Sequence, residues 1–310
     1  IRAQATGEMV MRLRRLLKED RRPPLDLRVA LPLLAVLCVP SGLVGQEMGS
    51  AERFFDSDGV RIRYLDLGEG EAVVLLHGFA LSAEVNWGLT GLLDSLPEKY
   101  RMLALDQRGH GRSDKPHDPE DYGLAFVEDV IRLLDALEIE KAHVVGYSMG
   151  GTLALRLAAD HPDRVRSVVI GGAGWAPPGT PLPPGLQEWP AKIERIAEEG
   201  GSLTDAMWLP GWPDPTPEIR AFLDSNDAQA LAAVLKAMPA ADPTMASVRA
   251  IDVPVLAVIG EADFARPAVD ALADVKPDVE VAVLAGKNHA TAVFDAELGQ
   301  VVLNFLRAQR

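Results

Sequence analysis

A serine, a carboxylate and a histidine stand at three separated places in this chain, in an order that can support acyl transfer. Ser148 lies between Gly146 and Gly150, Asp263 comes later in the chain, and His289 follows after that. A histidine oriented by a carboxylate can take the serine proton, so that the hydroxyl attacks a carbonyl carbon. The pattern predicts Ser148 as nucleophile, His289 as general base and Asp263 as the residue that orients the base.

The residues around Ser148 predict a sharp turn between a strand and a helix. The apolar run 142–145 is typical of a buried strand, and residues 152–159 are typical of a helix that packs on a sheet. The turn strains the backbone at the serine and leaves room only for glycine two residues before and after it. Ser148 would then lie at a helix N-terminus, where unpaired N–H groups favour negative charge on a bound oxygen.

The other two candidate residues also follow strand-like runs. Residues 253–260 form an apolar run that ends just before Asp263. Residues 279–284 form a second run, and His289 stands on the loop after it. Both side chains are therefore expected at the ends of strands, where loops present them for chemistry.

The acid of the site has two local competitors. Glu261 and Asp270 lie close to Asp263 in the sequence. An acid after the preceding strand-like run, 167–172, is a further arrangement, but that run leads into glycines and an alanine without a carboxylate. Asp263 is favoured by elimination.

A second N–H donor for the reacting oxygen is expected on an earlier loop. The apolar run 72–76 is followed by His77, Gly78 and Phe79. The backbone N–H groups of Phe79 and Met149 are the candidates for an oxyanion hole.

Residues 101–105 form one more strand-like run, and the segment 106–116 after it reads DQRGHGRSDKP. With the H-G-F, D-x-R-G-H-G-x-S, G-x-S-M-G-G, G-x-x-D and late histidine motifs, residues 54–310 resemble the α/β-hydrolase fold superfamily and its small esterase-like members. The resemblance implies a mostly parallel, doubly wound sheet flanked by helices, with a short helical cap inserted after strand 6. It is much less specific for substrate.

Residues 175–247 differ in character from the rest of the chain, and the superfamily places its cap at this position. Helix-like segments at 191–197 and 228–235 are separated by turns rich in proline and glycine. The tryptophans of the segment are Trp175, Trp189, Trp208 and Trp212. They favour a substrate with an apolar acyl group, although packing of the cap on the core explains them equally well.

The predicted organisation divides the chain into four parts. Residues 1–45 are an N-terminal extension with a signal peptide, and residues 46–174 are the first part of the core. Residues 175–247 are the cap, and residues 248–310 complete the core.

The N-terminal prediction rests on charge and hydropathy. Residues 1–30 carry a net charge of +4 and precede the uncharged run 29–45. This pattern predicts cleavage after Gly45 and export to the periplasm or the extracellular space. An N-terminal membrane anchor is the alternative, but the run is short for a span and contains two prolines. The only cysteine, Cys38, would be removed with the signal peptide, so thiol chemistry is not expected.

The composition excludes some classes of partner. The whole chain has a net charge of −14, and the part after residue 30 has a net charge of −18. Such an acidic body should repel nucleic acid and anionic lipid surfaces, so neither is expected as a partner, and no stable membrane association is expected after cleavage. No H-x-x-x-H or H-E-x-x-H pattern is present, so a metal site is not expected, and the chemistry requires no cofactor.

These observations predict a serine carboxylesterase or lactonase that acts on a small-molecule ester. A peptidase similar to proline iminopeptidases, a cofactor-free haloperoxidase or perhydrolase, and carbon–carbon hydrolases share the same three residues. A ligand receptor with the same fold is the alternative outside enzymes. Acyl length, alcohol preference and oligomeric state do not follow from the sequence.

Overall fold

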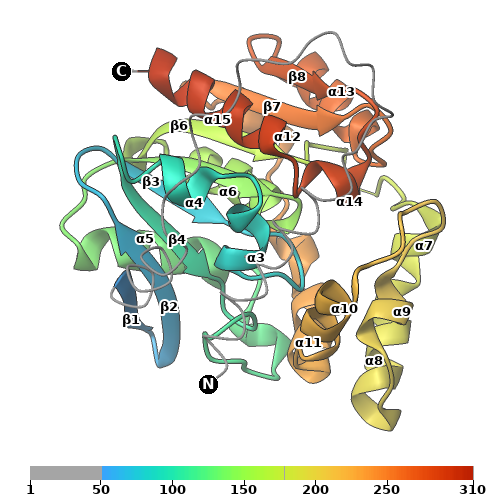
Figure 1. The fold of residues 1–310 in the computed structure, drawn as a ribbon. Coiled ribbons are helices and arrows are strands. Elements are labelled where there is room, and N and C mark those ends of the chain that lie inside the picture. The colour runs from blue at the N-terminus through green and yellow to red at the C-terminus, as the bar shows by residue number, and fades with distance from the viewer. Residues whose placement is uncertain (1–50, 178, 310) are drawn as a thin grey trace, which may run out of the picture.

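The computed structural model describes residues 51–177 and 179–309, and its centre is one sheet of eight strands (Figure 1). In chain order the strands are β1 (Glu52–Ser57), β2 (Val60–Leu67), β3 (Ala72–Leu76), β4 (Arg101–Asp106), β5 (Ala142–Tyr147), β6 (Val165–Gly171), β7 (Val255–Gly260) and β8 (Glu280–Leu284). Their order across the sheet is β1-β2-β4-β3-β5-β6-β7-β8. Strand β2 pairs antiparallel with β1 and with β4, and every other pair of neighbours is parallel. The predicted α/β fold class is confirmed.

The antiparallel strands β1 and β2 form a hairpin that the sequence analysis did not identify. Asp58 and Gly59 make its two-residue turn, with φ values of 57° and 83°. Two left-handed residues in succession give the turn a twist that matches the twist of the strands on either side. The Asp-Gly pair between two strand-like runs is the sequence signal that could have located it.

Helices cover both faces of the sheet because side chains alternate between the faces along each central strand. Val74 and Leu76 of β3 belong to one buried apolar cluster, and Val73 and Leu75 belong to another. The first cluster joins the sheet to α5 (Ala125–Ala136), α6 (Met149–Asp160), α12 (Met245–Arg249) and α13 (Arg266–Val275). The second joins it to α3 (Ala83–Gly88), α4 (Leu92–Ser95), α14 (His289–Ala292) and α15 (Ala296–Ala308).

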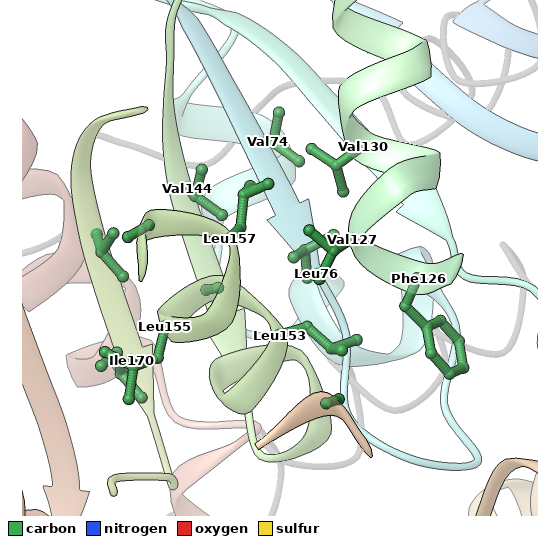
Figure 2. Close-up of a cluster of buried hydrophobic side chains, with 14 of the residues drawn as sticks. Val74, Leu76, Phe126, Val127, Val130, Val144, Leu153, Leu155, Leu157 and Ile170 are labelled. Carbon is green, nitrogen blue, oxygen red and sulfur yellow. The ribbon is translucent and has the colours of Figure 1, made fainter. Parts of the chain in front are cut away.

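Figure 2 shows the centre of the first cluster. The strands contribute Val74, Leu76, Val144 and Ile170; helix α6 contributes Leu153, Leu155 and Leu157; helix α5 contributes Phe126, Val127 and Val130. Each of these side chains is at most 2% exposed. The start of α6 is therefore held firmly against β3 and β5, the strands that lead to the candidate nucleophile and its oxyanion loop.

The chain between β6 and β7 forms short helices that lie to one side of the sheet in Figure 1. They are α7 (Pro184–Gln187), α8 (Trp189–Glu199), α9 (Leu203–Met207), α10 (Pro217–Asp224) and α11 (Ala228–Ala237), followed by α12. The 3-10 helix η3 (Met238–Ala241) follows α11 in this segment. Two others lie earlier in the chain, η1 (Pro119–Asp121) before α5 and η2 (Pro162–Arg164) before β6. A third apolar cluster joins α8 to α11 with Ala80 and Val85, which lie after β3 and in α3. This segment thus packs on the same end of the sheet as the candidate site.

The predicted signal segment 1–45 and Cys38 lie outside the described residues. Within residues 51–177 and 179–309, none of the helices combines the length and the hydropathy that a membrane span requires.

Candidate active site

Ser148 occupies the sharp turn between β5 and α6. Its backbone has φ 52° and ψ −116°, a conformation that few side chains adopt, and its N–H donates to the carbonyl of Gly171 on β6 at 2.7 Å. A Cβ at Gly146 would lie 2.6 Å from the nitrogen of Gly151, and a Cβ at Gly150 would lie 2.7 Å from the carbonyl oxygen of His77. The glycines are needed because backbone atoms, which cannot rotate aside, occupy the space of a side chain. Serine is thus held in a strained turn that presents its hydroxyl.

The structure brings Ser148, His289 and Asp263 together from three loops. His289 Nε2 lies 3.0 Å from Ser148 Oγ, and His289 Nδ1 lies 3.0 Å from each carboxylate oxygen of Asp263. Asp263 is 4% exposed and His289 is 8% exposed, whereas Ser148 is partly exposed. Because the carboxylate can only accept, Nδ1 carries the proton and Nε2 is left to accept the proton of the serine hydroxyl.

The loops after β7 and β8 are tied to each other, which fixes the distance between the acid and the histidine. Ala262 N–H, after β7, donates to the Lys287 carbonyl, after β8, at 2.8 Å. Tyr147 at the end of β5 adds a further tie, because its Oη–H donates to the His289 carbonyl at 2.7 Å. His289 begins α14, where Asn288 and Thr291 form a reciprocal cap. The histidine backbone is therefore held at both its carbonyl and its helix start.

The two local competitors of Asp263 have other partners. The Glu261 carboxylate accepts from the Gly286 N–H at 2.8 Å, and Asp270 pairs with Arg266 at 2.9 Å. Asp263 also accepts from the Ala265 N–H at 2.8 Å, which holds its carboxylate toward His289. Among these three acids, Asp263 is the one that contacts the histidine.

The proposed oxyanion residues lie next to the serine turn, one at the start of α6 and one in the loop after β3. Met149 is the first residue of α6, so its N–H has no acceptor within the helix. Phe79 follows Gly78, and a Cβ at Gly78 would lie 3.5 Å from Ser148 Cβ. The loop after β3 therefore passes directly beside the nucleophile.

Aromatic rings surround the His289 imidazole. Ring centroids lie 4.3 Å away for Phe264, 5.3 Å for Tyr147 and 6.2 Å for Trp212, whose ring is within 15° of parallel to the imidazole. Trp212 comes from the loop between α9 and α10, and Trp208 packs against it at 5.4 Å. Three aromatic rings thus pack around the candidate base, beside its polar contacts with Ser148 and Asp263.

Sequence reasoning did not assign Tyr147 or Phe264 to the site, and it connected Trp212 only with the substrate, as one of four tryptophans, and not with His289. The first two are direct neighbours of Ser148 and Asp263 in the sequence, and that adjacency was the available signal. Nothing local in the sequence shows that Trp212 lies near His289, because this contact depends on how the segment between β6 and β7 folds back.

Asp106 forms no side-chain ion pair with Arg108 or Arg112, the arginines nearest to it in the sequence. Asp106 pairs with Arg63 at 3.4 Å, and from Arg112 it accepts only the backbone N–H at 2.9 Å. The Arg108 side chain pairs instead with Asp129 at 2.6 Å. Arg63 lies on β2, which borders β4, so sheet order rather than sequence proximity selected the partner.

Two fully buried histidines, His77 in the oxyanion loop and His110 in the loop after β4, have ring centroids 5.2 Å apart. Burial lowers the pKa of His77 from 6.5 to about 4. Burial, together with the neighbouring His77, lowers the pKa of His110 from 6.5 to about 3. Both rings are therefore neutral in the folded protein at neutral pH.

We expect the free energy of unfolding to fall as the pH drops below 6.5. Each folded-state pKa is lower than the unfolded value, so the unfolded chain binds more protons between pH 6.5 and about pH 4 for His77 or about pH 3 for His110. The loss is about 2 kcal/mol for each ring between pH 6.5 and pH 5. Urea unfolding at a series of pH values measures it. His110→Asn, which can still donate to the Arg108 carbonyl, should remove about half of this dependence. A free energy of unfolding that stays constant from pH 7 to pH 5 would contradict the prediction.

Within the described part of the chain, no group of three or more His, Cys, Asp or Glu side chains is arranged to hold a metal ion. Two open concavities of about 420 Å³ each are lined by residues such as Lys141, Asp252 and Arg101. These residues lie before or at the amino ends of parallel strands, whereas Ser148, Asp263 and His289 follow the carboxyl ends. Ligands of open α/β sheets bind at the carboxyl ends, so the concavities are not part of the candidate site.

Comparison with known proteins places the chain in a family. The model of the alpha/beta hydrolase fold family matches residues 71–210. The putative 2-succinyl-6-hydroxy-2,4-cyclohexadiene-1-carboxylate synthase of Bacillus subtilis (strain 168) is 31% identical over 81% of this chain and 96% of its own length. The chain belongs to the α/β-hydrolase fold superfamily.

Two further similarities concern hydrolases. The 2-hydroxymuconate semialdehyde hydrolase of Pseudomonas sp. (strain CF600) is 34% identical over 54% of this chain and 51% of its own length. The enol-lactonase from Burkholderia xenovorans LB400 superposes with a TM-score of 0.69 at 26% identity, covering 82% of this chain and 100% of that one. Other curated relatives are matched over less of their length: the chain spans 51% of this semialdehyde hydrolase and 34% of the dihydrolipoyllysine-residue acetyltransferase component of the acetoin cleaving system of Cupriavidus necator.

Proposed function

We propose that this protein is a serine hydrolase that cleaves a carboxylic ester or lactone through an acyl-enzyme on Ser148. One observation carries the proposal: the Ser148 hydroxyl lies 3.0 Å from His289 Nε2, while Asp263 holds the other ring nitrogen. A serine hydroxyl is a weak nucleophile unless a neighbouring base takes its proton, and this arrangement supplies that base. The strained turn at Ser148 supports the same role, since strain of this kind is retained where it serves function.

The first half of the reaction forms the acyl-enzyme. His289 accepts the Ser148 proton as Oγ attacks the ester carbonyl carbon, and Asp263 stabilises the resulting imidazolium. The N–H groups of Phe79 and Met149 donate to the oxygen that becomes negatively charged. The imidazolium then donates its proton to the leaving alcohol, and the carbon–oxygen bond of the ester breaks.

The second half returns the enzyme to its starting state. His289 takes a proton from water, and the water oxygen attacks the acyl carbon on Ser148. The tetrahedral species collapses to release the carboxylic acid, and Ser148 regains its proton from His289. Only groups of the chain and water take part in these steps.

The apolar surroundings support a substrate with an apolar acyl group. Trp212 and Phe264 flank the base, and Trp189 stacks on Phe79 with centroids 5.9 Å apart. Aromatic side chains commonly line sites for small apolar ligands. The similarity to an enol-lactonase supports a lactone within this class.

A second candidate, hydrolysis of a carbon–carbon bond, is favoured by the similarity to 2-hydroxymuconate semialdehyde hydrolase. The test is to measure turnover of a meta-cleavage product, such as 2-hydroxymuconate semialdehyde, and of the ester and lactone panel with the same enzyme preparation. Faster turnover of the carbon–carbon substrate than of every ester and lactone would make this candidate the function.

A fluorophosphonate probe tests the nucleophile without knowledge of the substrate. We expect one covalent adduct per chain, mapped by peptide mass spectrometry to Ser148, because the probe reacts with serines that a base has activated. Hydrolysis of p-nitrophenyl esters from acetate to palmitate, measured in parallel, should show an optimum of acyl length. Absence of an adduct, or an adduct on another serine, would overturn the proposed mechanism.

A further inference from the structure

We infer that His77, Asn86 and Gln107 are positioning residues that lock the two peptide planes around Gly78, so that the Phe79 N–H faces the reacting oxygen. The inference rests on the proposed acyl-transfer function and deepens it. None of the three side chains is assigned to substrate; each acts through the backbone of the oxyanion loop.

The first locked plane is the peptide between His77 and Gly78. The Gly78 N–H donates to Asn86 Oδ1 at 2.9 Å, and the Gln107 side-chain amide donates to the His77 carbonyl at 2.6 Å. In a trans peptide the N–H and the C=O point in opposite directions. Hydrogen bonds at both ends therefore prevent rotation of this plane.

The second locked plane is the peptide between Gly78 and Phe79. The Gln107 backbone N–H donates to His77 Nε2 at 3.0 Å, so that this nitrogen is unprotonated and the ring proton resides on Nδ1. Nδ1 lies 2.8 Å from the Gly78 carbonyl and donates to it. Because the carbonyl is held toward the buried histidine, the Phe79 N–H of the same peptide points to the opposite side.

The locked backbone lies beside the nucleophile. A Cβ at Gly78 would lie 3.5 Å from Ser148 Cβ and 3.6 Å from Asn86 Oδ1. The end of β3 is also in close contact with the start of α6, where Met149 supplies the other candidate N–H. The two candidate donors thus come from segments that both lie beside Ser148.

Burial makes these four hydrogen bonds persistent. His77 and Asn86 are 0% exposed and Gln107 is 3% exposed, so water does not compete for their hydrogen bonds. The lowered pKa of His77, about 4, keeps Nε2 able to accept at neutral pH. Rotation of the Gly78–Phe79 peptide would replace a donor by a carbonyl oxygen next to the developing negative charge.

The effect on rate follows from the role of the donor. Removal of one oxyanion donor typically lowers kcat by about 100-fold to 1,000-fold. Ground-state binding of the ester is little affected, since the donor acts on charge that develops only in the transition state. A side chain that merely stabilised the fold would not change kcat selectively in this way.

The test compares three variants of the positioning residues with a matched control. His77→Leu removes both bonds of the ring, His77→Asn keeps a donor for the Gly78 carbonyl, and Gln107→Met removes only the bond to the His77 carbonyl. The control is His143→Leu, because His143 is also buried, at 1% exposed, but bonds to Ser167 away from the site. Urea unfolding of each variant shows the cost in stability.

For p-nitrophenyl acetate we expect His77→Leu to lower kcat about 100-fold with KM changed less than about threefold. His77→Asn should recover about tenfold of that loss, and Gln107→Met should lower kcat about tenfold. His143→Leu should stay within about threefold of wild type. Folded His77→Leu or Gln107→Met with wild-type kcat, or a loss confined to KM, would overturn the inference. If His77→Leu does not fold, the kcat values of Gln107→Met and His77→Asn decide whether the inference holds.

The rate of fluorophosphonate labelling at Ser148 separates this inference from the proposed substrate. Phosphonylation also places negative charge on an oxygen at the oxyanion position, so it needs the same N–H donors. If wild type is labelled but hydrolyses no ester, the ester proposal fails. Slow labelling of His77→Leu would then still support the inference, and labelling at the wild-type rate would overturn it.

Discussion

Replacing Ser148 by alanine is expected to lower kcat/KM for the best ester by about 10⁴-fold to 10⁶-fold. The loss is large because no other atom of the site can form the acyl-enzyme once Oγ is removed. Ser148 Oγ is the atom within 3.0 Å of the base, and Asp263 and His289 would remain in place without a nucleophile. Initial rates on the p-nitrophenyl ester series, with matched protein concentrations, measure the change.

A serine and histidine pair buried within the sheet provides the control. Ser167 Oγ lies 2.7 Å from His143 Nδ1 on neighbouring strands, and Ser167 is 0% exposed. Ser167→Ala should keep kcat/KM within about threefold, since this pair is not part of the site. Equal activity of wild type and Ser148→Ala would contradict the proposed mechanism, as would an equal loss in Ser167→Ala.

The double variant Ser148→Ala with Asp263→Asn tests whether Ser148 and Asp263 act as one unit. Residues that act as one unit show losses that do not add, so the double variant should be about as slow as Ser148→Ala alone. Asp263→Asn alone should lose about 10⁴-fold, because an amide can stabilise the wrong tautomer of His289. Additive losses would show that the two residues act independently.

The largest expected effect on stability follows replacement of Gly150 by alanine. The added Cβ would lie 2.5 Å from the Leu76 carbonyl carbon and 2.7 Å from the His77 oxygen, which belong to the end of β3 and the loop after it. The backbone of a central strand cannot give way without moving the sheet, and α6 must therefore shift. We expect a loss of more than about 4 kcal/mol in the free energy of unfolding, or an insoluble protein.

Gly59→Ala is the matched control for Gly150→Ala. Gly59 has φ 83°, but nothing lies within 4 Å of a Cβ there. Its cost should be about 1 kcal/mol, from the left-handed backbone alone. Urea unfolding of both variants at neutral pH compares them. A Gly150→Ala protein within about 1 kcal/mol of wild type, with retained activity, would show that the turn tolerates a side chain.

Much of the core could be predicted from the sequence because its signals are local. The apolar runs at 72–76 and 142–145 correspond to β3 and the first part of β5, and the helix-like run 152–159 lies within α6. A buried parallel strand is apolar along its whole length, which makes it visible in a single sequence. The hairpin of β1 and β2 was missed because its alternation is interrupted by charged residues on both faces.

The partners of the buried polar groups were not predictable in the same way. Arg63 holds Asp106 across the sheet, whereas Arg108 and Arg112, which lie close to Asp106 in the sequence, pair with other acids. Asn86 and Gln107 carry no motif that connects them with Gly78, although both bond to the backbone of the oxyanion loop. Such contacts depend on which strands and loops become neighbours, and strand order is a property of the whole sheet.

The sequence by itself determined the residue types and their order: a strained serine turn between glycines, then an acid, then a histidine, each after a strand. The tertiary structure decided the distances, because Ser148 and His289 are 141 residues apart and meet only when β5, β7 and β8 lie in one sheet. It also decided which side chains surround His289, since Trp212, from the segment between β6 and β7, packs on the imidazole. Propensity and spacing act over a few residues, whereas packing joins residues that are distant along the chain.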